Sequence, residues 1–315
     1  MIRANLIHLS YNMWNDDPKP FADQPDHILH ETSYRPYLRF DDALWRHIVE
    51  RMENLGMTMI ILDVGDAVRF ESHPEIALPD AWSREKLTQE LAFCRKHGLE
   101  VIPKFNFSTC HDTWMGDYGR MVSTPAYYQV CRDLINETTE LFDRPRFFHI
   151  GMDEEEARHQ TRYLYACMRQ GRLWWHDLQF LVDAVEARGA RAMVWADKLW
   201  TCGIEEYAAN MPKTVVQMNW YYGTYFADQD PTDNQPWFNR RTLEAFDELD
   251  ARGYEQIPTG SNFTYRENLA LLADYCSTRL TPGRLPGYCQ TPWQPTTERW
   301  RKHHDDALDG CRNVG

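Results

Sequence analysis

Four acidic residues in a row, 153–156, directly follow an apolar stretch that has the character of a buried strand. The stretch spans 147–151 and comes after a turn signal at 143–145. Like charges repel, and a buried carboxylate must be paired or protonated. Strand alternation points Asp153 and Glu154 to opposite faces, but both can rim one pocket where the strand splays open at its end. Two carboxylates in one pocket can exchange protons with a ligand.

The same acidic run also fits the first turn of a helix, because a helix N-terminus stabilises negative side chains. Both interpretations stay open for the run taken alone. We expect a helix start to account for Glu155 and Glu156, and the chemistry to fall to Asp153 and Glu154.

Composition excludes several classes of partner. The 315 residues carry a formal net charge of -13, which argues against binding to nucleic acid or to an anionic membrane surface. No apolar run is long enough to span a bilayer, and Met1 leads into a strand without a cleavable signal pattern. The 8 cysteines include no Cys-x-x-Cys pair, which argues against a metal–thiolate site and favours a reducing compartment. We therefore expect a cytoplasmic protein, and the sequence leaves its oligomeric state open.

A repeated junction organises the chain: helical periodicity ends at a glycine, and a strand begins within two residues. The junction recurs at Gly56, Gly98, Gly189 and Gly253. A glycine just beyond a helix takes the left-handed conformation at little cost. Four junctions of this kind predict helices alternating with the strands of a parallel sheet.

Eight strands are expected, at residues 4–10, 57–63, 100–105, 146–152, 192–196, 214–219, 255–259 and 285–289. Amphipathic helices are expected at residues 42–55, 83–97, from 125 after the Thr124-Pro125 start signal, 173–188, 239–252, 265–276 and 297–308. This α/β pattern predicts one (β/α)8 TIM barrel as a single domain of residues 1–315. The alternative, an open doubly wound sheet, lacks a glycine-rich phosphate loop after the first strand.

The longest connecting segments all follow strands, which predicts enlarged βα loops. They span residues 14–40, 64–82, 106–124 and 221–238. In such barrels the active site is assembled from these loops at the C-terminal mouth. The 12 Trp and 16 Tyr also cluster after predicted strands, and flat rings beside carboxylates suit the faces of sugars.

The run His149-x-Gly151-Met152-Asp153-Glu154 resembles the His-x-Gly-Gly-Asp-Glu pattern that ends the fourth strand of glycoside hydrolase family 20, the β-N-acetylhexosaminidases. The segment 98–103 is similar to that family's run into its third strand. The resemblance covers most of the chain and is strongest over 86–156. It implies an exo-acting hydrolase that removes a terminal β-linked N-acetylhexosamine with retention, and it implies no metal and no other cofactor.

The resemblance also assigns roles to the carboxylates. In the family, the Glu is the general acid/base and the Asp orients the substrate's own 2-acetamido group, which attacks the anomeric carbon. Carried onto this chain, Glu154 protonates the leaving oxygen, so it has to bear a proton near neutral pH. Asp153 stays ionised, holds the acetamido N–H and stabilises the positive oxazolinium.

The remaining substrate-binding candidates come from the same resemblance. His111 matches the family's histidine after the third strand, which supports the acid. Trp195, Trp220 and Trp293 match positions of an aromatic box around the acetamido methyl and the sugar ring. Weaker candidates are His149, whose strand position favours packing in the barrel interior, and Asp197, Tyr221, Asn262 and Tyr265.

Several positions depart from the family pattern. The segment 6–12 holds no counterpart of the first-strand Arg that grips distal hydroxyls, and the third-strand carboxylates are replaced by Lys104 and Asn106. The Trp-x-Glu expected after the eighth strand has Gln294 in place of the Glu. We also expect the family's smaller α/β domain ahead of the barrel to be missing, because the first strand begins close to Met1. The sugar, the aglycone and the pathway therefore stay open.

Three other functions remain possible on the sequence alone. A barrel could bind glycans without cleaving them. A metal-dependent enzyme could use Asp63 together with His111, Asp153 and Glu154 as ligands. Lys104 or Lys198 could form a Schiff base, although Lys104 is better interpreted as a buried charge partner of Asp63 or Glu154.

Overall fold

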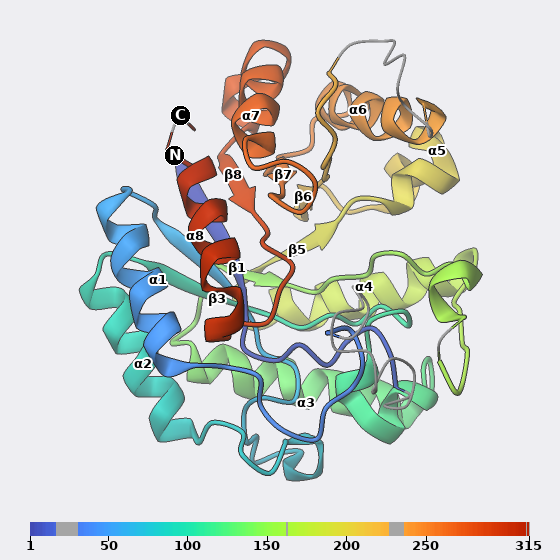
Figure 1. Cartoon of the computed structure of the whole chain (residues 1–315). Helices are drawn as coiled ribbons and strands as arrows, with labels where there is room; N and C mark the ends of the chain where they lie inside the picture. Colours follow the sequence, from blue (N-terminus) through green and yellow to red (C-terminus); the bar gives the residue numbers. More distant parts are fainter. Residues whose placement is uncertain (17–30, 162, 227–235, 313, 315) are drawn as a thin grey trace.

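The computed structural model describes residues 1–16, 31–161, 163–226, 236–312 and 314. Eight parallel strands stand side by side, and helices surround them (Figure 1). The strands are β1 (Ile2–His8), β2 (Met59–Asp63), β3 (Glu100–Lys104), β4 (Phe147–His149), β5 (Arg191–Trp195), β6 (Val216–Met218), β7 (Thr259–Gly260) and β8 (Gly287–Gln290). The helices are α1 (Asp42–Asn54), α2 (Arg84–Lys96), α3 (Pro125–Leu141), α4 (Arg172–Glu186), α5 (Lys198–Asn210), α6 (Pro236–Ala251), α7 (Asn268–Arg279) and α8 (Arg301–Gly310).

The strands form a ring in the order β6-β5-β4-β3-β2-β1-β8-β7. Between β6 and β7 the ring is completed by short parallel bridges, Gln217 to Gln256 and Trp220 to Thr259. There the backbone N–H of Thr259 donates to the carbonyl of Asn219 at 2.9 Å. The predicted (β/α)8 barrel is therefore confirmed.

Alternate residues of the strands pack into two cores. Leu6, Ile61 and Ile102 lie in a cluster that fills the barrel, whereas Ile60 and Leu62 belong to the larger cluster between strands and helices. This division follows from the two-residue repeat of a strand, and it explains why β2 is buried along its whole length.

The four glycine junctions behave as predicted. Gly56, Gly98, Gly189 and Gly253 all have positive φ, between 65° and 82°. Thr124 caps α3 by accepting a hydrogen bond from the N–H of Tyr127 at 3.3 Å.

Other element predictions need correction. Helix α5 was not predicted for two reasons. Gly203, with φ 78°, interrupts the helical repeat, and the helix buries only two of its side chains, Leu199 and Tyr207. Helix α7 begins at Asn268 rather than 265, and α8 begins at Arg301 after a short 3-10 turn. Strand β7 is only Thr259–Gly260, and between residues 255 and 258 of the predicted strand Gln256 alone forms an isolated bridge.

Two of the enlarged loops are covered in part. Residues 17–30 of the loop after β1 and 227–235 of the loop after β6 lie outside the described residues. Within the described part of the chain, no helix has both the length and the apolar character needed to cross a membrane.

Candidate active site

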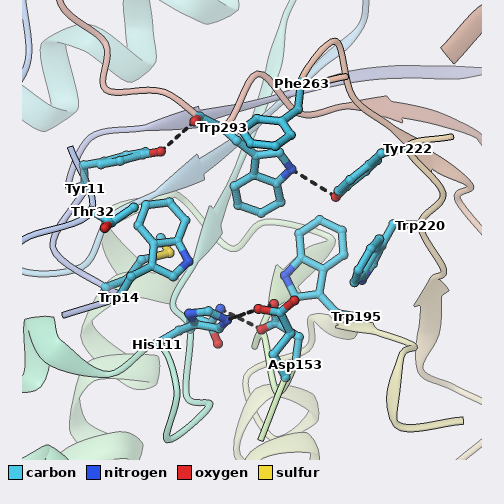
Figure 2. A pocket seen from close by; sticks show the side chains of 13 residues that line it. Tyr11, Trp14, Thr32, His111, Asp153, Trp195, Trp220, Tyr222, Phe263 and Trp293 are labelled. Atoms are coloured by element: carbon cyan, nitrogen blue, oxygen red, sulfur yellow. Dashed lines mark hydrogen bonds and ion pairs between the residues drawn. The ribbon is translucent and has the colours of Figure 1, made fainter. Parts of the chain in front are cut away.

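A cavity of about 300 Å³ opens at the C-terminal mouth of the barrel (Figure 2). Residues from both ends of the chain reach it, because the carboxyl ends of all eight strands meet there. The lining residues are Tyr11, Met13, Trp14, Thr32, Asn106, His111, Asp153, Glu154, Trp195, Trp220, Tyr222, Phe263 and Trp293.

The backbone that carries the two carboxylates is strained. Immediately after β4, Gly151, Met152 and Glu154 have φ of 72°, 73° and 56°. For the two non-glycine residues this conformation costs about 1–3 kcal/mol each. Gly151 has no alternative, since a Cβ there would lie 2.0 Å from Oδ1 of Asn106. The strain is held by hydrogen bonds from neighbouring strands.

Asn106 is one of these anchors. Its Oδ1 accepts from the N–H of Met152 at 3.3 Å, and its Nδ2 donates to Oδ1 of Asp153 at 2.8 Å. An amide can do both at once because it carries a donor and an acceptor. This departure from the family pattern thus fixes the carboxylate of Asp153.

His111 joins the two carboxylates. Its Nε2 lies 3.4 Å from Oδ2 of Asp153 and 3.2 Å from Oε2 of Glu154. Burial alone lowers the pKa of His111, but the two carboxylates raise it to about 10, so the ring is an imidazolium. Burial alone raises the pKa of Asp153, yet His111, Lys104 and the bond from Asn106 bring that pKa below its ordinary value. Asp153 is therefore ionised.

Asp197 lies behind Glu154 and is absent from the cavity lining. Its Oδ2 accepts a hydrogen bond from the N–H of Glu154 at 2.9 Å. Asp197 therefore stabilises the strained backbone and does not contact the space for a ligand. Burial and the charge of Asp153 raise the pKa of Asp197 well above its usual range. A neutral acid next to an ionised one avoids placing two buried negative charges side by side.

The three predicted tryptophans all line the cavity. Trp195 and Trp293 have ring centroids 5.9 Å apart, and Trp220 stacks on Tyr222 at 4.9 Å with an angle of 21°. Nε1 of Trp293 donates to the hydroxyl of Tyr222 at 3.0 Å. In Figure 2 Trp293 and Tyr222 lie across the cavity from the point where His111 meets Asp153, whereas Trp195 lies next to Asp153.

Four other predicted site residues lie outside the lining. His149 is fully buried, accepts from the N–H of Gly151 at 3.0 Å and packs on Trp195, as its strand position predicts. Asn262 donates to the carbonyl of His303 at 2.9 Å. Tyr221 donates its hydroxyl to the carbonyl of Tyr225, and Tyr265 is 41% exposed at the surface.

Sequence reasoning did not predict seven lining residues as part of the site: Tyr11, Met13, Trp14, Thr32, Tyr222, Phe263 and Asn106, which stood out only as a departure from the family pattern. Two signals could have found some of them. Trp220 and Tyr222 are two residues apart beyond a strand, so they share a face that Tyr221 does not. Residues 11–14, which include Tyr11 and Trp14, follow shortly after β1. They therefore lie at the C-terminal end of the barrel, where active sites of this fold are built.

Neither of the two lysine candidates is among the residues that line the cavity. Lys104 is fully buried and donates to Oδ2 of Asp63, while Nδ1 of His8 lies 3.4 Å from the same oxygen. This confirms the interpretation of Lys104 as a charge partner of Asp63. Nζ of Lys198 lies 5.2 Å from the ring centroid of Trp174, on α4. Neither amine is placed to meet a carbonyl ligand in the cavity.

The residues proposed as metal ligands gather only in part. One ligand atom each from His111, Asp153 and Glu154 lies within 4.8 Å of the others, whereas Asp63 is engaged by Lys104. Nε2 of His111 contacts both carboxylates directly, at 3.4 Å from Oδ2 of Asp153 and 3.2 Å from Oε2 of Glu154.

The acidic run does not start a helix. The side chain of Glu155 is 2% exposed and forms an ion pair with Arg169, and Glu156 pairs with Arg158 at 2.7 Å. Only a short 3-10 turn, Ala157–Gln160, follows. The expected acidic first turn was wrong because a cation 14 residues downstream neutralises Glu155.

No family model matches the sequence. A β-hexosaminidase of Emericella nidulans is 22% identical over an alignment of 233 residues, and the match covers 63% of this chain and 36% of the relative. The chain thus spans about a third of the length of that curated relative.

Solved structures resemble the whole chain. The family 20 exo-β-N-acetylglucosaminidase of Vibrio harveyi, in complex with N-acetylglucosamine, has a TM-score of 0.62 at 11% identity over 99% of this chain and 54% of that one. The β-N-acetylhexosaminidase of Bacteroides fragilis has a TM-score of 0.63 at 12% identity over 99% and 66%. Dispersin B has a TM-score of 0.56 at 15% identity over 100% and 99%. The chain therefore has the fold of the family 20 catalytic barrel, in divergent form, and the resemblance seen in the sequence is confirmed.

Proposed function

We propose that this protein, with residues 1–315 as its catalytic domain, is a glycoside hydrolase that removes a terminal β-linked N-acetylhexosamine. One observation carries the proposal: His111 lies 3.4 Å from Asp153 and 3.2 Å from Glu154, in a cavity whose other lining residues are mostly aromatic. The carboxylates and His111 can transfer protons to and from a glycosidic bond, and the flat apolar rings beside them can pack on the face of a sugar.

In the proposed mechanism the substrate supplies the nucleophile. The acetamido carbonyl oxygen attacks the anomeric carbon, the bond to the leaving oxygen breaks, and Glu154 gives that oxygen a proton. Asp153 accepts a hydrogen bond from the acetamido N–H and stabilises the positive oxazolinium. Water then attacks the anomeric carbon, the bond from that carbon to the acetamido oxygen breaks, and Glu154 takes a proton from the water. The acetamido group and the acid are restored, and the product keeps the starting configuration.

The two carboxylates differ in a way that supports this division. Asp153 is buried and fixed by Asn106 and His111, whereas the side chain of Glu154 is 28% exposed at the cavity. A stabilising anion benefits from rigidity, while a proton donor has to reach the leaving group.

The size of the cavity supports an exo-acting enzyme. A volume of about 300 Å³ is at the lower end of ligand pockets, which suits one sugar ring rather than the interior of a chain. The partner in this proposal is a carbohydrate glycoside.

A substrate panel tests the proposal. Aryl β-N-acetylglucosaminides and β-N-acetylgalactosaminides should be hydrolysed, while the matching aryl glucosides should be poor substrates because they carry no internal nucleophile. Equal turnover of the plain glucosides would contradict substrate assistance. Saturable binding of N-acetylglucosamine without any turnover would favour a glycan-binding barrel instead.

The cellular location is also a proposal. All eight cysteines are unpaired, which supports a reducing compartment such as the cytoplasm. Thiol labelling of protein purified without reductant and then denatured should find eight free thiols; a lower count would contradict the proposed compartment.

A further inference from the structure

One fully buried cation, Arg169, contacts the strained turn after β4. Arg169, in the segment before α4, has a side chain that is 1% exposed and is absent from the cavity lining. Its Nε lies 3.1 Å and 3.2 Å from the two carboxylate oxygens of Glu155, and its Nη2 also donates to that carboxylate. Nη2 further contacts Sδ of Met152 at 3.4 Å. One guanidinium thus holds two residues of the turn that carries Asp153 and Glu154.

The same guanidinium also holds the loop that carries His111. Its Nη2 donates to the carbonyl of Phe107 at 2.6 Å. Glu155, while paired with Arg169, accepts from the N–H of Thr109 at 3.0 Å. Thr109 is two residues before His111, and Glu155 directly follows Glu154. The ion pair therefore connects the two backbone segments whose separation sets the distances from His111 to the carboxylates.

The ion pair of Arg169 and Glu155 is also connected to helix α4. Nη1 of Arg169 donates to Oδ2 of Asp177 on α4 at 3.1 Å, and Asp177 also accepts from Ser123 at 2.6 Å. A planar guanidinium can serve two carboxylates and a carbonyl together because its five N–H groups lie in a fixed fork. A lysine has the charge but cannot match this geometry.

We infer that Arg169, acting through Glu155, is a positioning residue that sets the alignment of Glu154 and His111 for proton transfer. The inference rests on the proposed function. It assigns Arg169 no contact with the sugar, so its removal should impair the chemical step while leaving the aromatic side of the cavity able to bind.

Three variants test the inference. Arg169→Lys keeps the charge and loses the fork, and Glu155→Gln keeps the shape and loses the charge. The matched control is Arg51→Lys, since Arg51 also pairs with two carboxylates, Asp305 at 2.5 Å and Asp309 at 2.6 Å, between α1 and α8. All are compared with wild type below their thermal midpoints, on N-acetylglucosaminides with good and poor leaving groups.

Arg169→Lys should lower kcat for substrates with poor leaving groups about 10–100-fold, because a catalytic group displaced by about 1 Å or less loses activity on this order. The loss should be smaller on a dinitrophenyl glycoside, and the Kd for N-acetylglucosamine should stay within about threefold because the aromatic rings are untouched. Arg51→Lys should leave kcat unchanged. The inference is overturned if kcat is unchanged in both Arg169→Lys and Glu155→Gln, or if the control loses as much. Where Arg169→Lys does not fold, Glu155→Gln decides by the same measurements.

A second measurement separates this inference from the proposed function. If wild type hydrolyses none of the N-acetyl glycosides, the function fails, and NMR titration of His111, assigned with His111→Gln, still decides the positioning role. Carboxylates that move away from the ring should lower the pKa of His111 from about 10 by about one unit in Arg169→Lys and not in Arg51→Lys. An unchanged His111 pKa in both Arg169→Lys and Glu155→Gln overturns the inference.

Discussion

The cavity has two walls that are built on different principles. The charged wall consists of Asn106, His111, Asp153 and Glu154, from the loops after β3 and β4. The aromatic wall consists of Tyr11, Trp14, Trp195, Trp220, Tyr222 and Trp293, from β1, β5, β6 and β8 and their loops. On the charged wall hydrogen bonds and ion pairs hold both carboxylates and Nε2 of His111, and the backbone there is strained. On the aromatic wall most contacts are ring to ring, at centroid distances of 4.4–6.1 Å.

The difference predicts different responses to mutation. Hydrogen-bond and charge interactions weaken steeply with small displacements, so the charged wall should act as a unit and lose function sharply. Ring contacts tolerate small shifts, so the aromatic wall should lose affinity in steps.

Glu154→Gln should cause the largest loss. An amide cannot protonate the leaving oxygen, so kcat should fall about 10²–10⁴-fold for glycosides with poor leaving groups. The loss should be much smaller for a dinitrophenyl leaving group, which departs without a proton. Glu156→Gln, on a side chain paired with Arg158 outside the cavity lining, is the control and should be unaffected. A loss independent of the leaving group would remove Glu154 from the acid role.

Asp153→Asn should lower the rate for every acetamido substrate by about 10²–10³-fold, because the charge that stabilises the oxazolinium is gone. Steady-state rates across a leaving-group series measure this. A loss that depends on the leaving group would show that the two carboxylates had been assigned the wrong way round.

The barrel could be predicted because its signals are local. A glycine at a helix end and an apolar run of five residues can both be recognised within a few consecutive residues. Each of the four junction glycines, Gly56, Gly98, Gly189 and Gly253, marks the end of one helix in this way. Helix α5 escaped because Gly203 interrupts the pattern over a similarly short range.

The anchors of the site could not be predicted in the same way. Asn106 reaches Asp153 across 47 residues, and Arg169 pairs with Glu155 from the far end of the same long segment between β4 and α4, so neither partner is adjacent to its carboxylate in the sequence. Tyr222 is different: the two-residue repeat from Trp220 was available and favoured Tyr222 over Tyr221.

The charged wall should also make stability depend on pH. The pKa of His111 is raised in the fold to about 10, so its stabilisation is fully present below about pH 6.5 and is lost as pH rises through about 10. The pKa of Asp153 is lowered, so its stabilisation is present above about pH 4 and is lost as pH falls. The difference in unfolding free energy between wild type and His111→Gln, from urea titrations, should be greatest near pH 5–6 and shrink towards pH 10. A difference that grows with pH would contradict the imidazolium.

Trp220→Ala tests the aromatic wall. Removing the ring that stacks on Tyr222 should raise KM about tenfold with little change in kcat, since a stacking contact contributes to ground state and transition state alike. Trp220→Phe should recover most of the affinity. A collapse of kcat comparable to that of Glu154→Gln would show that the walls are not separable.

The smallest effect should come from Tyr222→Phe, which keeps the ring on Trp220 and removes the acceptor for Nε1 of Trp293. One hydrogen bond at a part-buried site contributes about 1 kcal/mol, which corresponds to about fivefold, so KM should rise by about fivefold at most as Trp293 gains freedom. Tyr221→Phe is the matched control, because its hydroxyl bonds the carbonyl of Tyr225 and the ring is absent from the cavity lining. It should lower the thermal midpoint without changing KM. If Tyr221→Phe raised KM and Tyr222→Phe did not, the face that β6 presents to the sugar would be the opposite of the one described, and the aromatic wall would have to be redrawn around Tyr221.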